Sequence, residues 1–501
     1  FSILNGETDY YVEIDAGAFV DADGNLSAGV SGSGTWSFTT TYDTFVQTVG
    51  GDFEDNGRAV IGLEDDPTAE FLSVGTVGFE GGDKDILVTV FKEDGTPSHI
   101  MNIGTSAIDQ AHDVLQHSTG NIFIVGNSNS DSLLVALDEN GNLEYAKVFG
   151  DNGSADGLNS IAELGDGGLV LGGGLTSNGY LLKVDPEDGD VLWERELDLG
   201  DSTQVVDVVA PSDSIFDNAG TNDFLVLNNI DRGSVDHEFN IARVNHSSGA
   251  IEWSYDLSIS GSQTPKAMFF DESSNTVFAV GQNSTNESLI TGFQLDADGD
   301  PIVTSEFAFD IYVGISTVVN DIVEAADGNI IIVGQYLNGT YNDIFVMKLD
   351  PAQLTDQADN DLEIIFAKTI GTTGFDEAAL GVHIDEGGQI VLTGTATNGS
   401  GEPDMLNIVL RNNGTTTNLP PGWTLNDVTS TAQGVFDDQS VSFVSMSSGD
   451  SVNVSAAAST QDVDVTDDMA TGNAEDSNIA RILSDNDLEE ILGTDNTAMN
   501  G

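Results

Sequence analysis

Short apolar runs that end in glycine recur along this chain. A strand-like segment and a turn precede each run. A polar loop, a third strand with an acidic hairpin and a fourth strand follow it. The series reads FLSVG at 71–75, IFIVG at 122–126, LVLGG at 169–173, FLVLN at 224–228, VFAVG at 277–281, IIIVG at 330–334 and IVLTG at 390–394. Four strands in roughly fifty residues, joined by Asx-Gly turns, are typical of a β-propeller blade. We therefore predict an all-β fold with a seven-bladed β-propeller over 41–425.

A repeated hexapeptide indicates how the ring closes. YAKVFG at 145–150 and FAKTIG at 366–371 fall at the fourth, outermost strands of units two and six, and a looser copy, FVQTVG, stands at 45–50. That third copy precedes the first unit, whereas the seventh unit lacks an outer strand. We expect the N-terminal strand to complete the last blade, which removes open sheet edges. Unit four carries an insertion around 211–223, so six or eight blades stay open as alternatives.

The first forty residues differ from the repeats. They contain a Tyr-rich strand, a turn from Asp21 to Asn25, and a final Trp-Ser-Phe-Thr-Thr from Trp36 to Thr40. This pattern resembles the last strands of bacterial Ig-like domains of the SbsA type. The resemblance implies a partial Ig-like β-sandwich at 1–40, whose missing strands lie upstream or come from another molecule. Such domains serve as spacers in large surface proteins, and the propeller repeats resemble those of secreted and surface-anchored bacterial proteins.

The C-terminal part changes composition again. Alternation in VSFVSMSSGDSVNVSAAA at 441–458 predicts a β-hairpin, a small β-domain or an extra layer on the propeller within 426–460. An acidic tail follows at 461–501. Within it, a short helix is predicted to start at Ser484 or Asp485 and to end at Gly493.

The charge restricts both partners and surroundings. The chain has 13 Lys and Arg against 84 Asp and Glu, a net charge of −71, and no cysteine. Such a surface repels a phosphate backbone, so we expect no nucleic-acid partner. The sequence lacks an apolar run of about 18 residues, so we expect no direct membrane insertion. Self-repulsion of this size is relieved by salt or divalent cations, which favours an extracellular, cell-surface location in a saline or marine setting.

One repeated acidic position is a candidate cation site. Counting back eleven residues from the turn glycines Gly120, Gly167 and Gly387 leads to Asp109, Asp156 and Asp376, and Asp55 is the first-blade equivalent. Thr264 and Thr317 occupy the position in units five and six. A ring of oxygen ligands at the channel mouth would suit weakly bound Ca²⁺. The favoured interpretation is structural, because Asp and Thr both bond their own loop backbone but Thr is a poor cation ligand.

Other candidate chemistry is weaker. Four acidic hairpins resemble the start of an EF-hand loop without its twelfth-position glutamate. The histidines lack zinc-type spacing, and His112 beside Asp113 is an isolated pair. Lys183, Arg243 and Lys348 share one repeat position that indicates a structural role. Trp193 and Trp253 resemble the outer-strand tryptophans of quinoprotein-type repeats, although packing between blades is the expected role of both.

These patterns favour a non-enzymatic structural or adhesion module of a large secreted or cell-surface protein. Its expected partners are copies of itself, other surface proteins or polysaccharide, and strand addition to 1–40 would make it a subunit of a surface layer or fibre. One alternative is a propeller enzyme, either a polysaccharide hydrolase or lyase or a quinoprotein-like dehydrogenase. A deep pocket at the channel mouth, with a carboxylate of raised pKa beside aromatic walls, would favour the hydrolase. Exposed aromatic platforms in the loops would favour a lectin-like binder.

Overall fold

The computed structural model describes most residues between 9 and 445, together with 463–464 and 481–482. Within the first range it does not describe 21–24, 33–34, 40–43, 64–70, 93–94, 106, 140, 151–155, 176, 201, 212–222, 232–236, 259–260, 284–286, 314–315, 355–361, 386, 417 and 437–441. Most of the insertion expected at 211–223 and the helix expected in the tail therefore lie outside the described residues.

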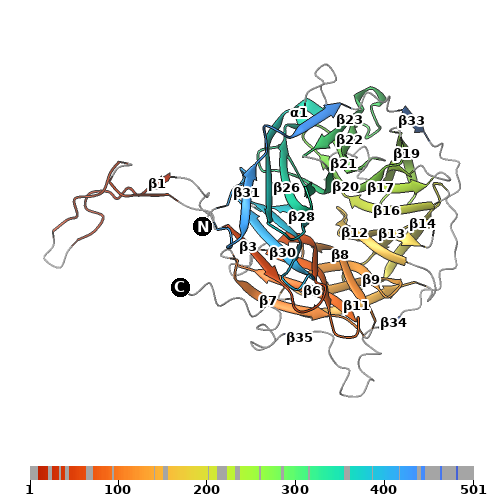
Figure 1. Ribbon diagram of the computed structural model, residues 1–501, viewed down its shortest axis with the longest axis horizontal. Helices are drawn as coiled ribbons and strands as arrows, with labels where there is room; N and C mark the ends of the chain where they lie inside the picture. Colours follow the sequence, from red (N-terminus) through yellow and green to blue (C-terminus); the bar gives the residue numbers. More distant parts are fainter. Residues whose placement is uncertain are drawn as a thin grey trace.

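Seven antiparallel sheets stand around a common axis, and each repeats one order of four strands (Figure 1). Blade 1 contains β4 (Asn56–Gly62), β5 (Phe71–Gly78), β6 (Lys84–Phe91) and β7 (Pro97–Ile103). Blade 2 contains β8 (Asp109–Gln116), β9 (Ile122–Ser128), β10 (Asp131–Leu137) and β11 (Leu143–Phe149). Blade 3 contains β12 (Asp156–Glu163), β13 (Leu169–Leu175), β14 (Asn178–Val184) and β15 (Val191–Leu197). Blade 4 contains β16 (Ser202–Val209), β17 (Phe224–Asp231), β18 (His237–Val244) and β19 (Ile251–Ser258). Blade 5 contains β20 (Thr264–Asp271), β21 (Thr276–Gln282), β22 (Ser288–Gln294) and β23 (Phe307–Tyr312). Blade 6 contains β24 (Thr317–Glu324), β25 (Ile330–Asn338), β26 (Tyr341–Leu349) and β27 (Ile364–Thr372). Short helical turns η1 (Val303–Ser305) and α1 (Pro351–Leu354) precede the outer strands of blades 5 and 6.

The last blade joins both ends of the repeat region. It contains β28 (Glu377–Ile384), β29 (Ile390–Thr397) and β30 (Pro403–Leu410), and its fourth strand is β3 (Phe45–Val49). The register runs from Phe45 opposite Val409 to Val49 opposite Met405. The predicted closure by the N-terminal strand is confirmed. The chain is a seven-bladed β-propeller.

The hydrophobic core lies between the blades, because alternate side chains of one strand face opposite neighbours. In β9, Ile122 and Ile124 pack with the residues of blade 1. Phe123 and Val125 of the same strand pack with those of blade 3. Both faces of every middle strand are therefore buried, which explains why these strands read as continuous apolar runs in the sequence.

The repeated hexapeptide is fixed at both of its ends by contacts with other strands. Its first residue is an aromatic that packs on the turn glycine of the next blade's last hairpin. A Cβ built on that glycine would lie within 2.5–2.8 Å of the ring, for the pairs Phe45 with Gly95, Tyr145 with Gly189 and Phe366 with Gly414. Its last residue is a glycine beneath a carboxylate of the third strand. A Cβ there would lie within 2.5–2.6 Å of that group, for Gly50 under Asp404, Gly150 under Asp131 and Gly371 under Asp343.

The C-terminal segment adds outer strands to the blades in reverse order. β31 (Trp423–Asp427) pairs with β27, β32 (Gln433–Phe436) with β23, β33 (Ser442–Ser445) with β19, β34 (Val463–Asp464) with β11 and β35 (Arg481–Ile482) with β7. These strands make five-stranded sheets of blades 6, 5, 4, 2 and 1, and they lie on the outside of the ring in Figure 1. Within 426–460, the described strands β32 and β33 are outer strands of the propeller, and most of 441–458, where the hairpin is expected, lies outside the described residues.

The N-terminal residues form an arm that extends away from the propeller (Figure 1). β1 (Asp9–Tyr11) pairs with β2 (Ser37–Thr39), and isolated bridges join Ile14 to Val30 and Val20 to Leu26. The described part of the arm is therefore a long, irregular hairpin. That it is part of an Ig-like domain stays a prediction.

Candidate functional site

Two of the acids predicted to ring the channel mouth, Asp55 and Asp109, lie at the start of inner strands and bind nearby backbone groups. Asp55 is buried, and its carboxylate accepts hydrogen bonds from the N–H groups of Gly51, at 2.7 Å, and Gly78, at 2.9 Å. Asp109 is also buried and accepts from the N–H and the hydroxyl of Thr105, at 2.6 and 3.0 Å. At the same position, the hydroxyl of Thr317 accepts from the N–H of Val313 at 2.8 Å. These contacts match the loop-fixing role, and calcium binding at this ring stays a prediction.

Two members of the predicted ring are one residue out of register. Every inner strand has a bulge two residues after the shared position, and in blade 7 the shift between Ala379 and Gly381 makes Glu377 the equivalent residue. The turn residue with a positive φ there is Gly388, not Gly387. Asp376 is instead exposed, and its carboxylate accepts from the N–H of Asn342 at 2.7 Å.

The same comparison corrects blade 5, where the shift between Pro265 and Ala267 makes Gln263 the equivalent residue rather than Thr264. The first hairpin of blade 5 is one residue longer than those of blades 2, 3, 6 and 7, so counting eleven residues back from its turn stops one position short of Gln263. Asp156 begins β12, in register with Asp109, as the sequence predicts.

Three further aspartates lie at the central channel. Asp113, Asp207 and Asp321 directly follow the bulges of the inner strands of blades 2, 4 and 6. Each carboxylate accepts from the next N–H of its own strand at 2.8 Å, those of Val114, Val208 and Ile322. Each also accepts from the following blade, from the N–H groups of Ile161 at 3.0 Å and of Met268 and Val382 at 2.8 Å. The three side chains therefore link neighbouring blades in pairs.

The channel raises the pKa of all three carboxyls. Each keeps some contact with solvent, yet protein surrounds it. This desolvation is the main cause that raises the pKa of Asp113 to about 7 and that of Asp321 to about 8, and it raises that of Asp207 as well. The charge of Asp207 adds to the shift at both other sites, which indicates that the three converge around the axis.

The bulged residues themselves carry the cations of the channel. Arg58 and Lys266 are in contact with solvent in the channel. The surrounding protein nevertheless desolvates their charges, which lowers the pKa of each. Arg58 also lowers the pKa of Lys266, which places the two side chains near each other across the lumen. His112 is the bulged residue of blade 2, and its Nδ1 lies 2.7 Å from the carbonyl oxygen of Leu158 in the next blade. His112 is therefore part of a blade contact.

The sequence contained a signal for the three channel aspartates. They stand in HDV at 112–114, VDV at 206–208 and NDI at 320–322, four residues after the shared starting position. The other blades have small residues there, namely Ala59, Ser160, Ala267 and Gly381. Aligning the units on the start of the inner strand would have revealed this alternation of acid and small residue.

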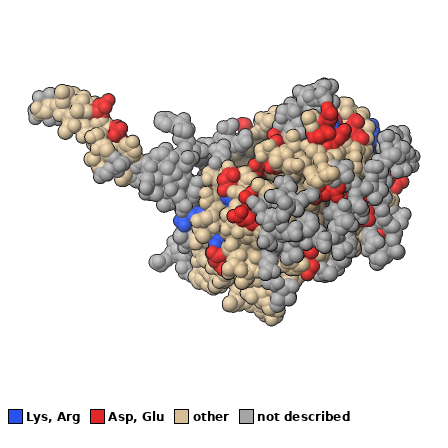
Figure 2. Space-filling model, turned by 90° about the horizontal axis from the view of Figure 1, so that it is seen from above, with Lys and Arg blue, Asp and Glu red and all other residues tan. Residues whose placement is uncertain are grey.

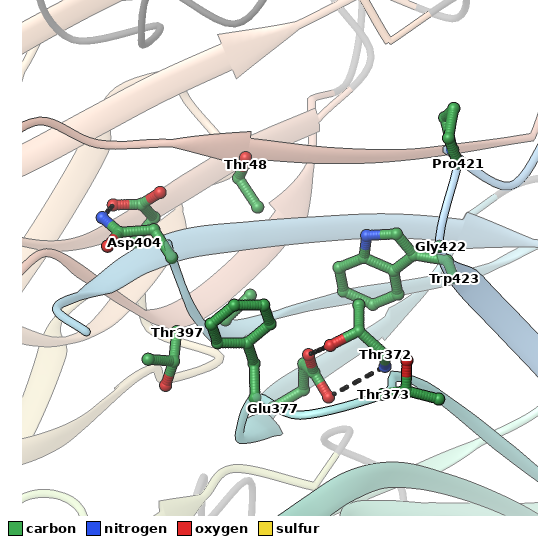
Figure 3. Close-up of a pocket in the computed structure, with 12 residues that line it drawn as sticks. Thr48, Thr372, Thr373, Glu377, Thr397, Asp404, Pro421, Gly422 and Trp423 are labelled. Atoms are coloured by element: carbon green, nitrogen blue, oxygen red, sulfur yellow. Dashed lines mark hydrogen bonds between the residues drawn. The ribbon is translucent and has the colours of Figure 1, made fainter. Parts of the chain in front are cut away.

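A cavity of about 310 Å³ lies between blades 6 and 7 (Figure 3). Its lining comes from segments far apart in the sequence: Thr48, Thr372, Thr373, Phe375, Glu377, Ala396, Thr397, Asn398, Asp404, Pro421, Gly422 and Trp423. The last three belong to the turn and strand that the C-terminal segment adds to blade 6. The cavity is therefore complete only when β31 is in place.

Two carboxyl groups face this cavity, and both have raised pKa values. Glu377 is buried, and it accepts from the hydroxyl of Thr372 at 2.6 Å and from its N–H at 3.2 Å. Burial raises its pKa to about 7. Asp404 accepts from the amide nitrogen of Asn398 at 2.8 Å, and burial raises its pKa to about 6. Glu377, Ala396 and Asp404 lie directly opposite one another on adjacent strands, so both acids belong to one face of blade 7.

Most other sequence candidates have structural roles. The cationic repeat position forms ion pairs with the first hairpin of its own blade, Lys183 with Asp166, Arg243 with Asp223 and Lys348 with Asp327. The indoles of Trp193 and Trp253 donate to the carbonyl oxygens of His246 and Gly299 in the next blade, both at 2.9 Å. Among the described residues, no group of three or more His, Asp or Glu is placed to hold a metal ion. Nor does that part of the chain contain a helix with the length and apolar character of a membrane span.

Comparisons with known proteins find only distant structural likeness. No protein-family model matches the chain, and no curated protein matches its sequence significantly. Among solved structures, the Dos1 propeller has 10% identity and a TM-score of 0.43, over 74% of this chain and 96% of its own. A putative 6-phosphogluconolactonase from Bacteroides fragilis has 14% identity and a TM-score of 0.42, over 66% of this chain and 95% of its own. The periplasmic gluconolactonase of Pseudomonas aeruginosa has 12% identity and a TM-score of 0.40, over 73% of this chain and 98% of its own. At such low identity the likeness concerns the fold alone.

Proposed function

We propose that the chain is a non-enzymatic structural module of an extracellular assembly, in which the N-terminal hairpin pairs with strands of another copy. The supporting observation is the apolar surface of that hairpin. The exposed fractions of its large side chains are 53% for Tyr11, 63% for Phe19, 60% for Val20, 70% for Leu26 and 52% for Trp36. An isolated two-stranded hairpin is marginally stable in water, so strands that cover these side chains would stabilise it. Strand addition from a second copy supplies such a cover.

The propeller suits the role of a rigid, acidic body. Asp and Glu are spread over the described surface, and basic side chains are few (Figure 2). Closure by β3 leaves blade 7 with the four strands of the other blades, and the added C-terminal strands cover five outer edges. Because a net charge of −71 opposes contact between copies, association requires salt or divalent cations such as Ca²⁺. An extracellular, saline setting supplies both.

The alternative of a propeller enzyme is favoured by one feature, the cavity between blades 6 and 7, where Glu377 and Asp404 lie beside Phe375 and Trp423. The channel gives it less support. The three channel aspartates are occupied by backbone N–H groups of two blades. The channel-mouth acids with described side chains bind their own or neighbouring loops. A quinoprotein-like dehydrogenase would need basic groups to hold an anionic cofactor, and the chain has only 13 Lys and Arg.

The test is the oligomeric state of the whole chain against a variant that lacks residues 1–40. Sedimentation velocity in 0.5 M NaCl, with and without Ca²⁺, should show concentration-dependent association of the whole chain only. A double substitution, Phe19→Ser with Trp36→Ser, should weaken association and leave the propeller's thermal unfolding unchanged. A chain that stays monomeric in both salts, or a deletion variant that associates equally well, would overturn the proposal.

A further inference from the structure

The cavity between blades 6 and 7 has an aromatic wall that a defined turn positions. The N–H of Trp423 donates to the carbonyl oxygen of Pro420 at 3.1 Å, and Gly422 has φ +93°. Proline at the second position and glycine with positive φ at the third are characteristic of a type II turn. Trp423 then begins β31, opposite Thr372, whose N–H and hydroxyl hold Glu377. The indole and the carboxyl of Glu377 are thus positioned by the same residue.

A second aromatic ring at the cavity is fixed by contacts on both sides of its loop. Phe375 is 37% exposed. Its neighbour Asp376 accepts from the N–H of Asn342 in blade 6 through its carboxylate, at 2.7 Å. The carbonyl oxygen of Asp376 accepts from the N–H of Thr397 in blade 7, at 2.9 Å. The loop that carries Phe375 is therefore held between both blades, and the ring is presented without a further ordering step.

Apart from Ala396, Pro421 and Gly422, the remaining described lining is polar, and it contains no basic residue. Four threonines, Asn398 and two carboxyl groups share the cavity with the two aromatic rings. At about 310 Å³ it lies at the lower end of ligand pockets, which enclose roughly 300–1,000 Å³. Hydroxyl and carboxylate oxygens on one side and aromatic surfaces on the other match a molecule with a polar edge and an apolar face. The lack of a basic residue, together with Glu377 and Asp404, disfavours an anionic ligand.

We propose that this cavity binds an uncharged sugar ring at the end or along the chain of a polysaccharide. Trp423 and Phe375 contact the apolar C–H faces of the ring. Asp404 accepts hydrogen bonds from its hydroxyl groups, and Glu377 orders the floor through Thr372. This site goes beyond the structural role proposed above and does not depend on it, because no arm residue lines the cavity. Failure of arm-mediated association would leave sugar binding intact, and failure of sugar binding would leave arm-mediated association intact.

The test is isothermal titration of the whole chain with cellotetraose, mannotetraose and chitotetraose as uncharged probes and tetragalacturonate as the anionic probe. We expect at least one uncharged probe to bind with a dissociation constant in the millimolar range or tighter and to perturb tryptophan fluorescence. We expect tetragalacturonate to bind at least tenfold more weakly. No heat with any uncharged probe, or equal affinity for tetragalacturonate, would overturn the proposal.

Variants connect the binding to the cavity. Phe375→Ala and Asp404→Asn should each lower the affinity by tenfold or more. Phe79→Ala is a matched control, because Phe79 is also 37% exposed but belongs to blade 1. Trp423→Phe keeps an aromatic ring and β31, so it should lower the affinity less than Phe375→Ala. Thermal unfolding of each variant confirms that the fold is retained. Equal affinity loss in Phe79→Ala and Phe375→Ala would show that binding lies elsewhere.

Discussion

Asp207 in the channel and Asp404 at the cavity are both aspartates on strands of repeated units, and their surroundings differ. Asp207 accepts from the N–H groups of Val208 and Met268 and from the hydroxyl of Ser160, all at 2.8 Å. Asp404 accepts a single side-chain bond, from Asn398. The acids of one fold are thus used in two ways. Those on the axis join blades through backbone groups, whereas Asp404 at the cavity has an oxygen atom that an external molecule can reach.

The largest expected effect is on stability, at the channel. Asp207→Ala leaves the N–H of Met268 without its acceptor, which costs roughly 1–3 kcal/mol, and leaves the N–H of Val208 with only its 3.2 Å bond to the hydroxyl of Ser160. We expect a loss of about 1–4 kcal/mol in the free energy of unfolding by guanidinium titration. Asp207→Asn should cost less, since its amide oxygen still accepts one bond. A loss below about 1 kcal/mol in Asp207→Ala would show that the channel bonds do not hold the blades.

The same channel should make stability depend on pH. The pKa values of Asp113 and Asp321 are raised to about 7 and about 8, so the folded chain binds protons that the unfolded chain releases. Stability should therefore rise as the pH falls from 8 to 5, by up to about 1.4 kcal/mol per pH unit for each proton. Below pH 4 it should fall again, because Asp166 and Asp327, paired with lysines, have lowered pKa values.

A double variant separates the channel from the cavity in this pH profile. Asp113→Asn with Asp321→Asn should flatten the dependence of the melting temperature on pH between 6 and 8. Glu377→Gln should remove a smaller part, because only one group with a pKa of about 7 is lost. A steeper profile in the double variant than in the parent chain would contradict the assignment to the channel.

The smallest effect is expected at Asp404. Asp404→Asn keeps the shape of the side chain and removes a carboxylate with a raised pKa, so the free energy of unfolding should change by less than about 1 kcal/mol. Its sugar affinity should nevertheless fall as described above. Denaturation and titration on the same sample would check both. A large loss of stability in this variant would place Asp404 with the structural acids of the channel.

The sequence was sufficient for the architecture because the propeller repeats its signals. The apolar run of each unit, buried on both faces, and the aromatic and glycine ends of FVQTVG at 45–50 are local patterns with one structural solution. The register of the inner strands was less secure. In blade 7, two adjacent glycines offered two turn positions, and only the positive φ of Gly388 decides between them.

The cavity could not be predicted from the sequence. Thr48 is separated from Phe375 and Trp423 by most of the chain, and the three meet only because β3 closes blade 7 and β31 is added to blade 6. Trp423 is preceded by Pro-Pro-Gly, a turn signal, but the sequence does not say which sheet receives the strand that follows. The short outer strands beyond it have two to five residues each, too few for a clear alternation.

The reverse path of the C-terminal strands has a mechanical consequence. A chain pulled from its C-terminal end would lose β35, β34 and β33 one after another, each as a short strand at the rim of a different blade. Force applied through the N-terminal arm would instead load β3, whose five residue pairs seal the ring. The C-terminal end therefore detaches one short strand at a time, while the N-terminal end transmits tension to the β3–β30 pair that closes the propeller.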